Sequence, residues 1–167
     1  MDFIYENKSS LDPEFCKSVI KKFINDDRKK NNSIPISRFI DWEGVTNSLD
    51  EILKNSIEEY KNFVRDKIGV EVKYLNDMNN TGGYIVSKMD GSTWHSDFKK
   101  NPSDTHTVSY VWFLNTRKFD GETDFIYKKV KPEAGKLIMF PATWNSFYMD
   151  HPSEEKYIIT GWLSNNK

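Results

Sequence analysis

Apolar residues recur at helical spacing near the start of the chain. Asp12 can cap the N-terminus of a helix through its side chain, and Pro13 suits the first helical position. The pattern therefore predicts an amphipathic helix over residues 12–30. The apolar residues expected to face the interior are Phe15, Cys16, Val19, Ile20 and Phe23.

A second, longer helical pattern begins near Asn47 or Ser48. Gly69 is its expected end, because glycine readily adopts the left-handed conformation that terminates helices. Residues 31–44, between the two helices, are polar and interrupted by proline, which predicts a loop. The apolar positions of the second helix are Leu49, Ile52, Leu53, Ile57, Tyr60, Val64 and Ile68.

After residue 70 the pattern changes to short β-branched and aromatic runs separated by Gly, Pro, Asn and Asp. This texture is typical of many short strands joined by turns, and about eight strands are the number of a double-sheet jelly roll. The expected strands are Gly83–Met89, Thr93–Phe98, Thr105–Leu114, Thr123–Tyr127, Lys128–Lys131, Lys136–Phe140, Ser146–Asp150 and Lys156–Leu163.

The two halves together predict an α+β fold that is mainly β. We expect a double-stranded β-helix, or jelly-roll, core with supporting N-terminal helices. A chain of 167 residues is long enough for one domain with a sizeable core. We therefore expect a single domain over residues 1–167, with helical support in residues 1–69 and the jelly roll in residues 70–167.

Composition excludes several classes of protein. The 24 basic and 25 acidic residues give a net charge of -1 and form no long run of one sign, so we expect no nucleic-acid partner. The only cysteine, Cys16, rules out an intramolecular disulfide. No segment approaches the ~20 apolar residues that a membrane span needs, and the N-terminus does not resemble a secretion signal. We expect a soluble, cytoplasmic protein that does not bind membranes.

Candidate chemistry first appears in the stretch GSTWHSDF, which contains His95 and Asp97. Residues two apart on a strand face the same side, so these two side chains can point at one atom. An imidazole and a carboxylate are two of the three ligands of the facial triad that holds non-haem Fe(II). Only His106 and His151 could supply a second imidazole. Taken alone, the pair is more often a hydrogen-bonded surface pair.

Other motifs follow this pair in a characteristic order. They are THTVSYVWFLN, FDGETDF, PEAGKLIMFPATW and HPSEEKYIITGWL. In order and approximate spacing, the set resembles the Fe(II)/2-oxoglutarate-dependent oxygenases, most closely their prolyl 4-hydroxylase-like branch. The resemblance covers about residues 83–163, and the fold that it implies is the jelly roll expected from the strand pattern.

The resemblance implies roles for individual residues. His95 and Asp97 match the H-x-D iron ligands, and His151 matches the distal histidine, so these three would form the catalytic iron site. Lys156 matches the basic residue that pairs with the far carboxylate of 2-oxoglutarate. The other cosubstrate-binding residues that the resemblance implies are Thr160, Trp162 and, less directly, Tyr84. On a strand, Lys156, Thr160 and Trp162 would project to one side, as a shared pocket requires.

The assignment of the distal ligand leaves an alternative open. His151 stands five residues before Lys156, closer than is usual in the family. A hairpin loop between the two could still place both side chains inward on antiparallel strands. An alignment on FPATW instead puts Tyr148 in the histidine's place, and the two candidates would face opposite sides of a regular strand. We favour His151, because imidazole is a far better Fe(II) ligand than a neutral phenol.

The resemblance also implies the reaction. Fe(II), 2-oxoglutarate and O2 would be required, with ascorbate as an auxiliary reductant, and an unactivated C–H bond would be hydroxylated with release of succinate and CO2. The carboxylate of Asp97 favours hydroxylation, because halogenating relatives lack it. The expected substrate is a prolyl residue of a peptide or protein.

Two other classes of function stay open. One is a non-catalytic jelly-roll binding module whose metal site is vestigial or structural, and the spacing of His151 is its best support. The other is a zinc enzyme with the same three ligands. Zinc gives no reason for Lys156, Thr160 and Trp162 to share a face, so the oxygenase is the favoured interpretation.

Overall fold

The computed structural model describes residues 2–98, 107–143 and 145–165. Two α-helices and three 3-10 helices lie in the described ranges: α1 (Pro13–Ile24), η1 (Ile36–Arg38), η2 (Ile40–Trp42), α2 (Glu43–Ile68) and η3 (Lys73–Leu75). The strands are β1 (Tyr5–Asn7), β2 (Ser33–Pro35), β3 (Asn79–Asn80), β4 (Ile85–Met89), β5 (Val108–Phe113), β6 (Thr123–Phe125), β7 (Lys129–Val130), β8 (Leu137–Pro141), β9 (Tyr148–Asp150) and β10 (Lys156–Ser164).

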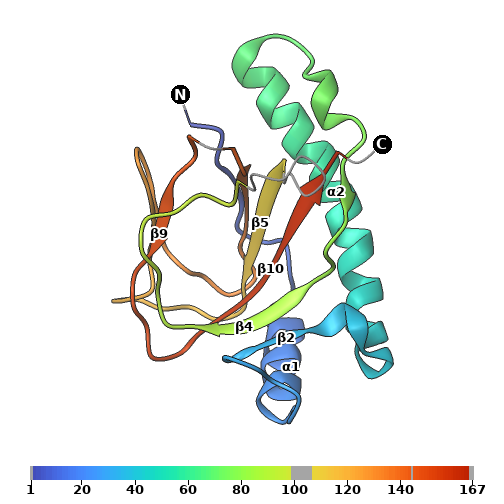
Figure 1. Ribbon diagram of the computed structural model, residues 1–167, viewed down its shortest axis with the longest axis vertical. Coiled ribbons are helices and arrows are strands. Elements are labelled where there is room, and N and C mark those ends of the chain that lie inside the picture. Colours follow the sequence, from blue (N-terminus) through green and yellow to red (C-terminus); the bar gives the residue numbers. More distant parts are fainter. Residues whose placement is uncertain (1, 99–106, 144, 166–167) are drawn as a thin grey trace.

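The strands form two antiparallel sheets. The large sheet has the order β1-β8-β5-β10-β4-β2, with β3 also paired to β10, and the small sheet has the order β7-β6-β9. In Figure 1, β9 stands at the left, across from β4, β5 and β10, while α2 runs along the right side and α1 lies below. The jelly-roll fold, mainly β with N-terminal helices, is confirmed.

Two apolar clusters lie on opposite faces of the large sheet. Strand β10 shows the division, because its successive side chains alternate between the faces. Ile159 and Leu163 pack in the cluster that includes the helices, whereas Ile158 packs in the cluster between the two sheets. Even-numbered positions of β10 therefore face the space between the sheets. Lys156 and Trp162 are among them.

The helices differ from the prediction mainly at their ends. Helix α1 ends at Ile24, because Asp26 leaves the helical pattern to bind Arg28 and the indole Nε1 of Trp42. Helix α2 begins at Glu43, before the expected Asn47, as a continuation of η2. Its predicted end is confirmed, since Gly69 caps it with φ of 77°.

The N-terminal third contributes more than helices. Its residues 31–44, expected as a loop, contain β2 and two 3-10 helices, and both β1 and β2 join the large sheet.

The expected strand Thr93–Phe98 is wrong, since only His95 makes a bridge there, to Tyr148. The other expected strands form, most with shorter bounds, whereas β8 is shifted by one residue and β10 extends one residue further, to Ser164. The first residues of Thr105–Leu114, including His106, lie outside the described residues.

No helix in the described ranges is both long and apolar enough to cross a membrane.

Gly135 fixes the N-terminal segment against the large sheet, because its carbonyl accepts from the amide of Leu11 and its amide donates to the carbonyl of Phe113. Its φ is 85°, and an added Cβ would lie 2.2 Å from the carbonyl oxygen of Leu11. We expect Gly135→Ala to lower the free energy of unfolding by about 2 kcal/mol or more, measured by urea denaturation. Gly44→Ala is the control, because an added Cβ there meets nothing within 4 Å and alanine favours the helix. Equal stability of the two variants would contradict this account.

Candidate metal centre

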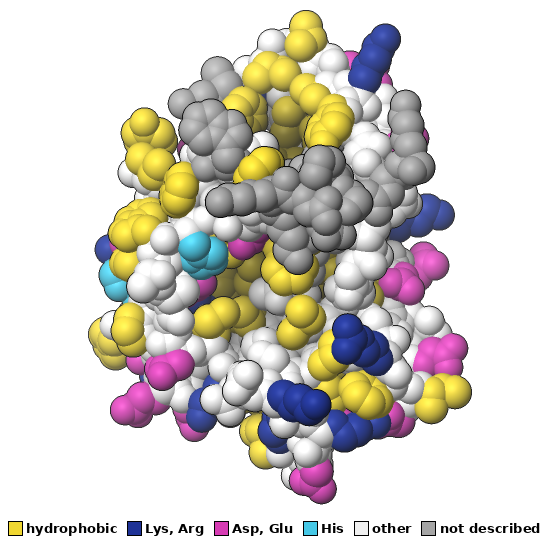
Figure 2. Space-filling model, viewed as in Figure 1, with side chains coloured by type: hydrophobic (Ala, Val, Ile, Leu, Met, Phe, Trp, Pro, Cys, Tyr) yellow, Lys and Arg dark blue, Asp and Glu magenta, His cyan; other side chains and the backbone are white. Residues whose placement is uncertain are grey.

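His95 and Asp97 lie together between the two sheets. The Nε2 atom of His95 is 3.8 Å from Oδ1 of Asp97. The other ring nitrogen, Nδ1, lies 2.7 Å from the carbonyl oxygen of Thr93, which can only accept a hydrogen bond. Nδ1 must therefore carry the proton, and the lone pair of Nε2 is left for a ligand on the side of Asp97. Figure 2 shows a hollow on the face of the molecule turned toward the viewer, with a hydrophobic floor and a histidine at its rim.

Asp97 is held by two hydroxyl groups. The hydroxyl of Ser109, on β5, donates to Oδ2 at 2.5 Å. The hydroxyl of Tyr148, on β9, lies 2.8 and 3.0 Å from the two carboxylate oxygens. The ring of Tyr148 also packs on His95, with 4.3 Å between the ring centroids. Burial, and then the neighbouring carboxylate of Asp97, raise the pKa of Tyr148 well above its ordinary value, so Tyr148 is a neutral donor.

His151 is not part of this group. The register pairs Thr123 with Asp150 and Phe125 with Tyr148, so Tyr148 and Asp150 point between the sheets. His151 follows on the opposite side, where its Nε2 lies 2.7 Å from Oδ2 of Asp124. The expected meeting of His151 with His95 and Asp97 is therefore not found. Across the ranges that the structure describes, no three His, Cys, Asp or Glu side chains form a metal-binding group.

Lys156 lies between the sheets, as expected, but His151 does not lie opposite it. Asp150 does, and its Oδ1 accepts a hydrogen bond from Nζ of Lys156 at 3.0 Å. The same oxygen accepts a bond of 2.7 Å from the hydroxyl of Thr123. The side chain of Lys156 is only 1% exposed, and its Nζ lies 5.4 Å from the ring centroid of Phe113. Its charge is thus compensated from within the protein.

Three further residues were expected to bind the cosubstrate. Thr160 and Trp162 share the face of Lys156 on β10, and Trp162 is paired with Ser109, the residue that donates to Asp97. Tyr84 lies instead on the helix side of the large sheet, where its hydroxyl donates to Asp50 at 2.6 Å. The sheet separates it from the pair formed by His95 and Asp97, so its expected contact with the cosubstrate does not fit this structure.

The donor set fits one part of the expected iron and cosubstrate site and disagrees with another. A free imidazole nitrogen and a carboxylate at 3.8 Å can bind the same metal ion, since each metal–ligand bond is about 2.1 Å long. The third neighbour, Tyr148, is a neutral phenol and hence a weak ligand for Fe(II). Lys156, the expected anchor of the far carboxylate, already has a carboxylate partner.

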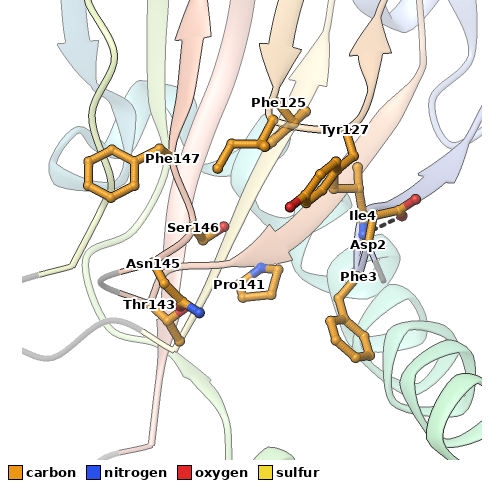
Figure 3. Close-up of a pocket in the computed structure, with 11 residues that line it drawn as sticks. Asp2, Phe3, Ile4, Phe125, Tyr127, Pro141, Thr143, Asn145, Ser146 and Phe147 are labelled. Atoms are coloured by element: carbon orange, nitrogen blue, oxygen red, sulfur yellow. Dashed lines mark hydrogen bonds between the residues drawn. The ribbon is translucent and has the colours of Figure 1, made fainter.

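An apolar cavity of about 500 Å³ lies close to this centre. In Figure 3, Phe147 lies on one side of it and Tyr127 on the other, with Pro141 between them. Phe125 also lines the cavity, and its ring centroid is 5.8 Å from that of Tyr148. Phe125 therefore connects the cavity wall to Tyr148, whose hydroxyl contacts Asp97.

Sequence reasoning missed the roles of Ser109 and Asp150. No sequence signal marked Ser109, because its contact with Asp97 depends on the packing of β5. A sequence signal did exist for Asp150, which stands two residues after Tyr148. Residues two apart on a strand share a face, so if the side chain of Tyr148 points inward, that of Asp150 does too.

Comparison with known proteins identifies relatives of this fold. Residues 82–164 match the family described as the 2OG-Fe(II) oxygenase superfamily. No curated protein matches the chain. A viral collagen prolyl hydroxylase from Paramecium Bursaria Chlorella virus-1, in a 2OG complex, is 20% identical with a TM-score of 0.71, over 99% of this chain and 97% of that one. A Pseudomonas putida prolyl-4-hydroxylase is 12% identical with a TM-score of 0.65, over 100% and 95% of the two chains.

Proposed function

Since the chain belongs to the 2OG-Fe(II) oxygenase superfamily, we propose that it is a dioxygenase that hydroxylates an unactivated C–H bond, in a prolyl residue of a peptide or protein. The reaction would use O2 and 2-oxoglutarate and release succinate and CO2 with the hydroxylated product. The observation that carries the proposal is the free Nε2 of His95, which faces the carboxylate of Asp97 in the space between the sheets.

The chain's own residues would bind and orient the metal. His95 and Asp97 would hold Fe(II), which activates O2 when it is bound with the cosubstrate. The carbonyl of Thr93 keeps the imidazole in the tautomer that can bind a metal. Tyr148 and Ser109 fix the orientation of the Asp97 carboxylate, and the ring of Tyr148 covers the imidazole.

The choice of a peptide or protein substrate has two supports. The viral and Pseudomonas putida proteins of the same fold are named as prolyl hydroxylases. The cavity near Phe125 is large enough for one side chain and is lined by apolar groups such as Phe147 and Pro141. Apolar walls of this kind suit a pyrrolidine ring and its neighbours in a peptide.

Metal and cosubstrate binding test the proposal. Under anaerobic conditions, Fe(II) and 2-oxoglutarate should together give the weak visible charge-transfer band of a metal-bound keto acid, and with O2 the protein should form succinate. We expect His95→Ala and Asp97→Ala each to remove both signals, because each deletes a ligand. His151→Ala should keep both, since His151 binds Asp124 instead.

A second candidate function is a non-catalytic binding module. The buried ion pair between Lys156 and Asp150 favours it, because the expected anchor of the cosubstrate is already paired. The same measurements separate the two functions. A protein that gives neither band nor succinate at millimolar 2-oxoglutarate, yet still binds a peptide, would be a binding module.

A further inference from the structure

A buried ion pair occupies the place where the proposed function needs a cation for the cosubstrate. Lys156 donates to Asp150 at 3.0 Å, and the side chains of the two residues are 1% and 11% exposed. Thr123 donates to the same carboxylate oxygen at 2.7 Å. The ammonium group therefore has an internal counter-charge.

The position of Asp150 is fixed by its backbone as well as by its side chain. Its amide donates to the hydroxyl of Ser92 at 3.0 Å, and its carbonyl accepts from the amide of Ser92 at 2.9 Å. Its pairing with Thr123 in the small sheet turns its side chain inward. The contacts with Ser92 and the pairing with Thr123 thus fix the backbone of Asp150 so that its carboxylate lies beside Lys156.

A second carboxylate at Lys156 would place two negative groups beside one ammonium in a desolvated space. Such an arrangement is unfavourable, because like charges repel strongly where water is excluded. Asp120 is a further acid close enough to Lys156 to feel its charge, and it is engaged by Arg117 at 2.7 Å and by Ser153 at 2.8 Å.

We propose that Asp150 is an internal competitor for the far carboxylate of 2-oxoglutarate, and that it sets the dicarboxylate affinity of this chain. The identity of the competing ligand rests on the proposed function. A dicarboxylate binds only when the carboxylate of Asp150 moves off Lys156. Removing the charge of Asp150 therefore strengthens dicarboxylate binding.

Titration calorimetry of the metal-free protein with glutarate tests this inference. Glutarate has both carboxylates and no keto group, so its binding reports on the Lys156 end of the site without any metal. Asp150→Asn, nearly identical in shape, should bind glutarate on the order of tenfold or more tightly than the unsubstituted chain. Asp124→Asn is the matched control, since Asp124 binds His151. The affinity of this variant for glutarate should equal that of the unsubstituted chain. Adding Lys156→Met to Asp150→Asn should remove the gain.

An Asp150→Asn variant that binds glutarate no better than the unsubstituted chain overturns the inference, and so does a gain that survives Lys156→Met. Asp150→Ser, which replaces the carboxylate with a smaller, uncharged hydroxyl group, provides a second variant if the first does not fold. The proposed function can fail separately. The protein could give neither the charge-transfer band nor succinate, while Asp150→Asn still binds glutarate more tightly than the unsubstituted chain.

Discussion

Replacing Tyr148 by histidine is expected to tighten the binding of Mn(II) or Fe(II) by about tenfold or more. The side chain at this position already contacts both the imidazole of His95 and the carboxylate of Asp97. An imidazole there would add a good nitrogen donor where the chain now has a neutral phenol. Calorimetric titration with Mn(II) in the absence of O2 measures the change.

His151→Ala is the control for that substitution. Its imidazole binds Asp124 on the outer side of β9, so metal affinity should stay within about twofold of the unsubstituted chain. The assignment of Tyr148 to the third position fails if His151→Ala loses metal binding while Tyr148→His gains none.

The second large effect concerns stability. Asp150→Ala should lower the free energy of unfolding by about 3–5 kcal/mol, because it leaves the charge of Lys156 buried without its partner. Chemical denaturation of the metal-free protein measures it.

The double variant Asp150→Leu with Lys156→Met separates two effects on stability: the loss of the whole ion pair and the burial of a single unpaired charge. Removing both charges should restore most of the lost stability, since a buried ion pair contributes little net stability relative to apolar residues of similar size. A double variant as unstable as Asp150→Ala would show that the loss has another cause.

The sequence predicted the helices and most strands because their signals are local. The apolar spacing from Leu49 to Val64 and the glycine at position 69 are sufficient for α2. Strands β1 and β2 could not be predicted, because each has three residues and is stabilised by a partner distant in sequence. Ile34, for example, is buried where β2 pairs with β4, far from it in sequence.

The site was predicted in part for a related reason. The placement of His95 and Asp97 two residues apart was sufficient to predict that they lie together. The choice between Tyr148 and His151 depended on which face of β9 turns inward. The pairing of Asp150 with Thr123 turns Tyr148, and not His151, toward the space between the sheets, and no local pattern reveals this register.

A crystal structure of the protein soaked with Mn(II) under anaerobic conditions, with anomalous scattering recorded at the manganese edge, tests the central claim most directly. We expect one strong peak within bonding distance of Nε2 of His95 and a carboxylate oxygen of Asp97, beside the hydroxyl of Tyr148. A peak at His151 and Asp124, or no peak at the pair, would contradict it.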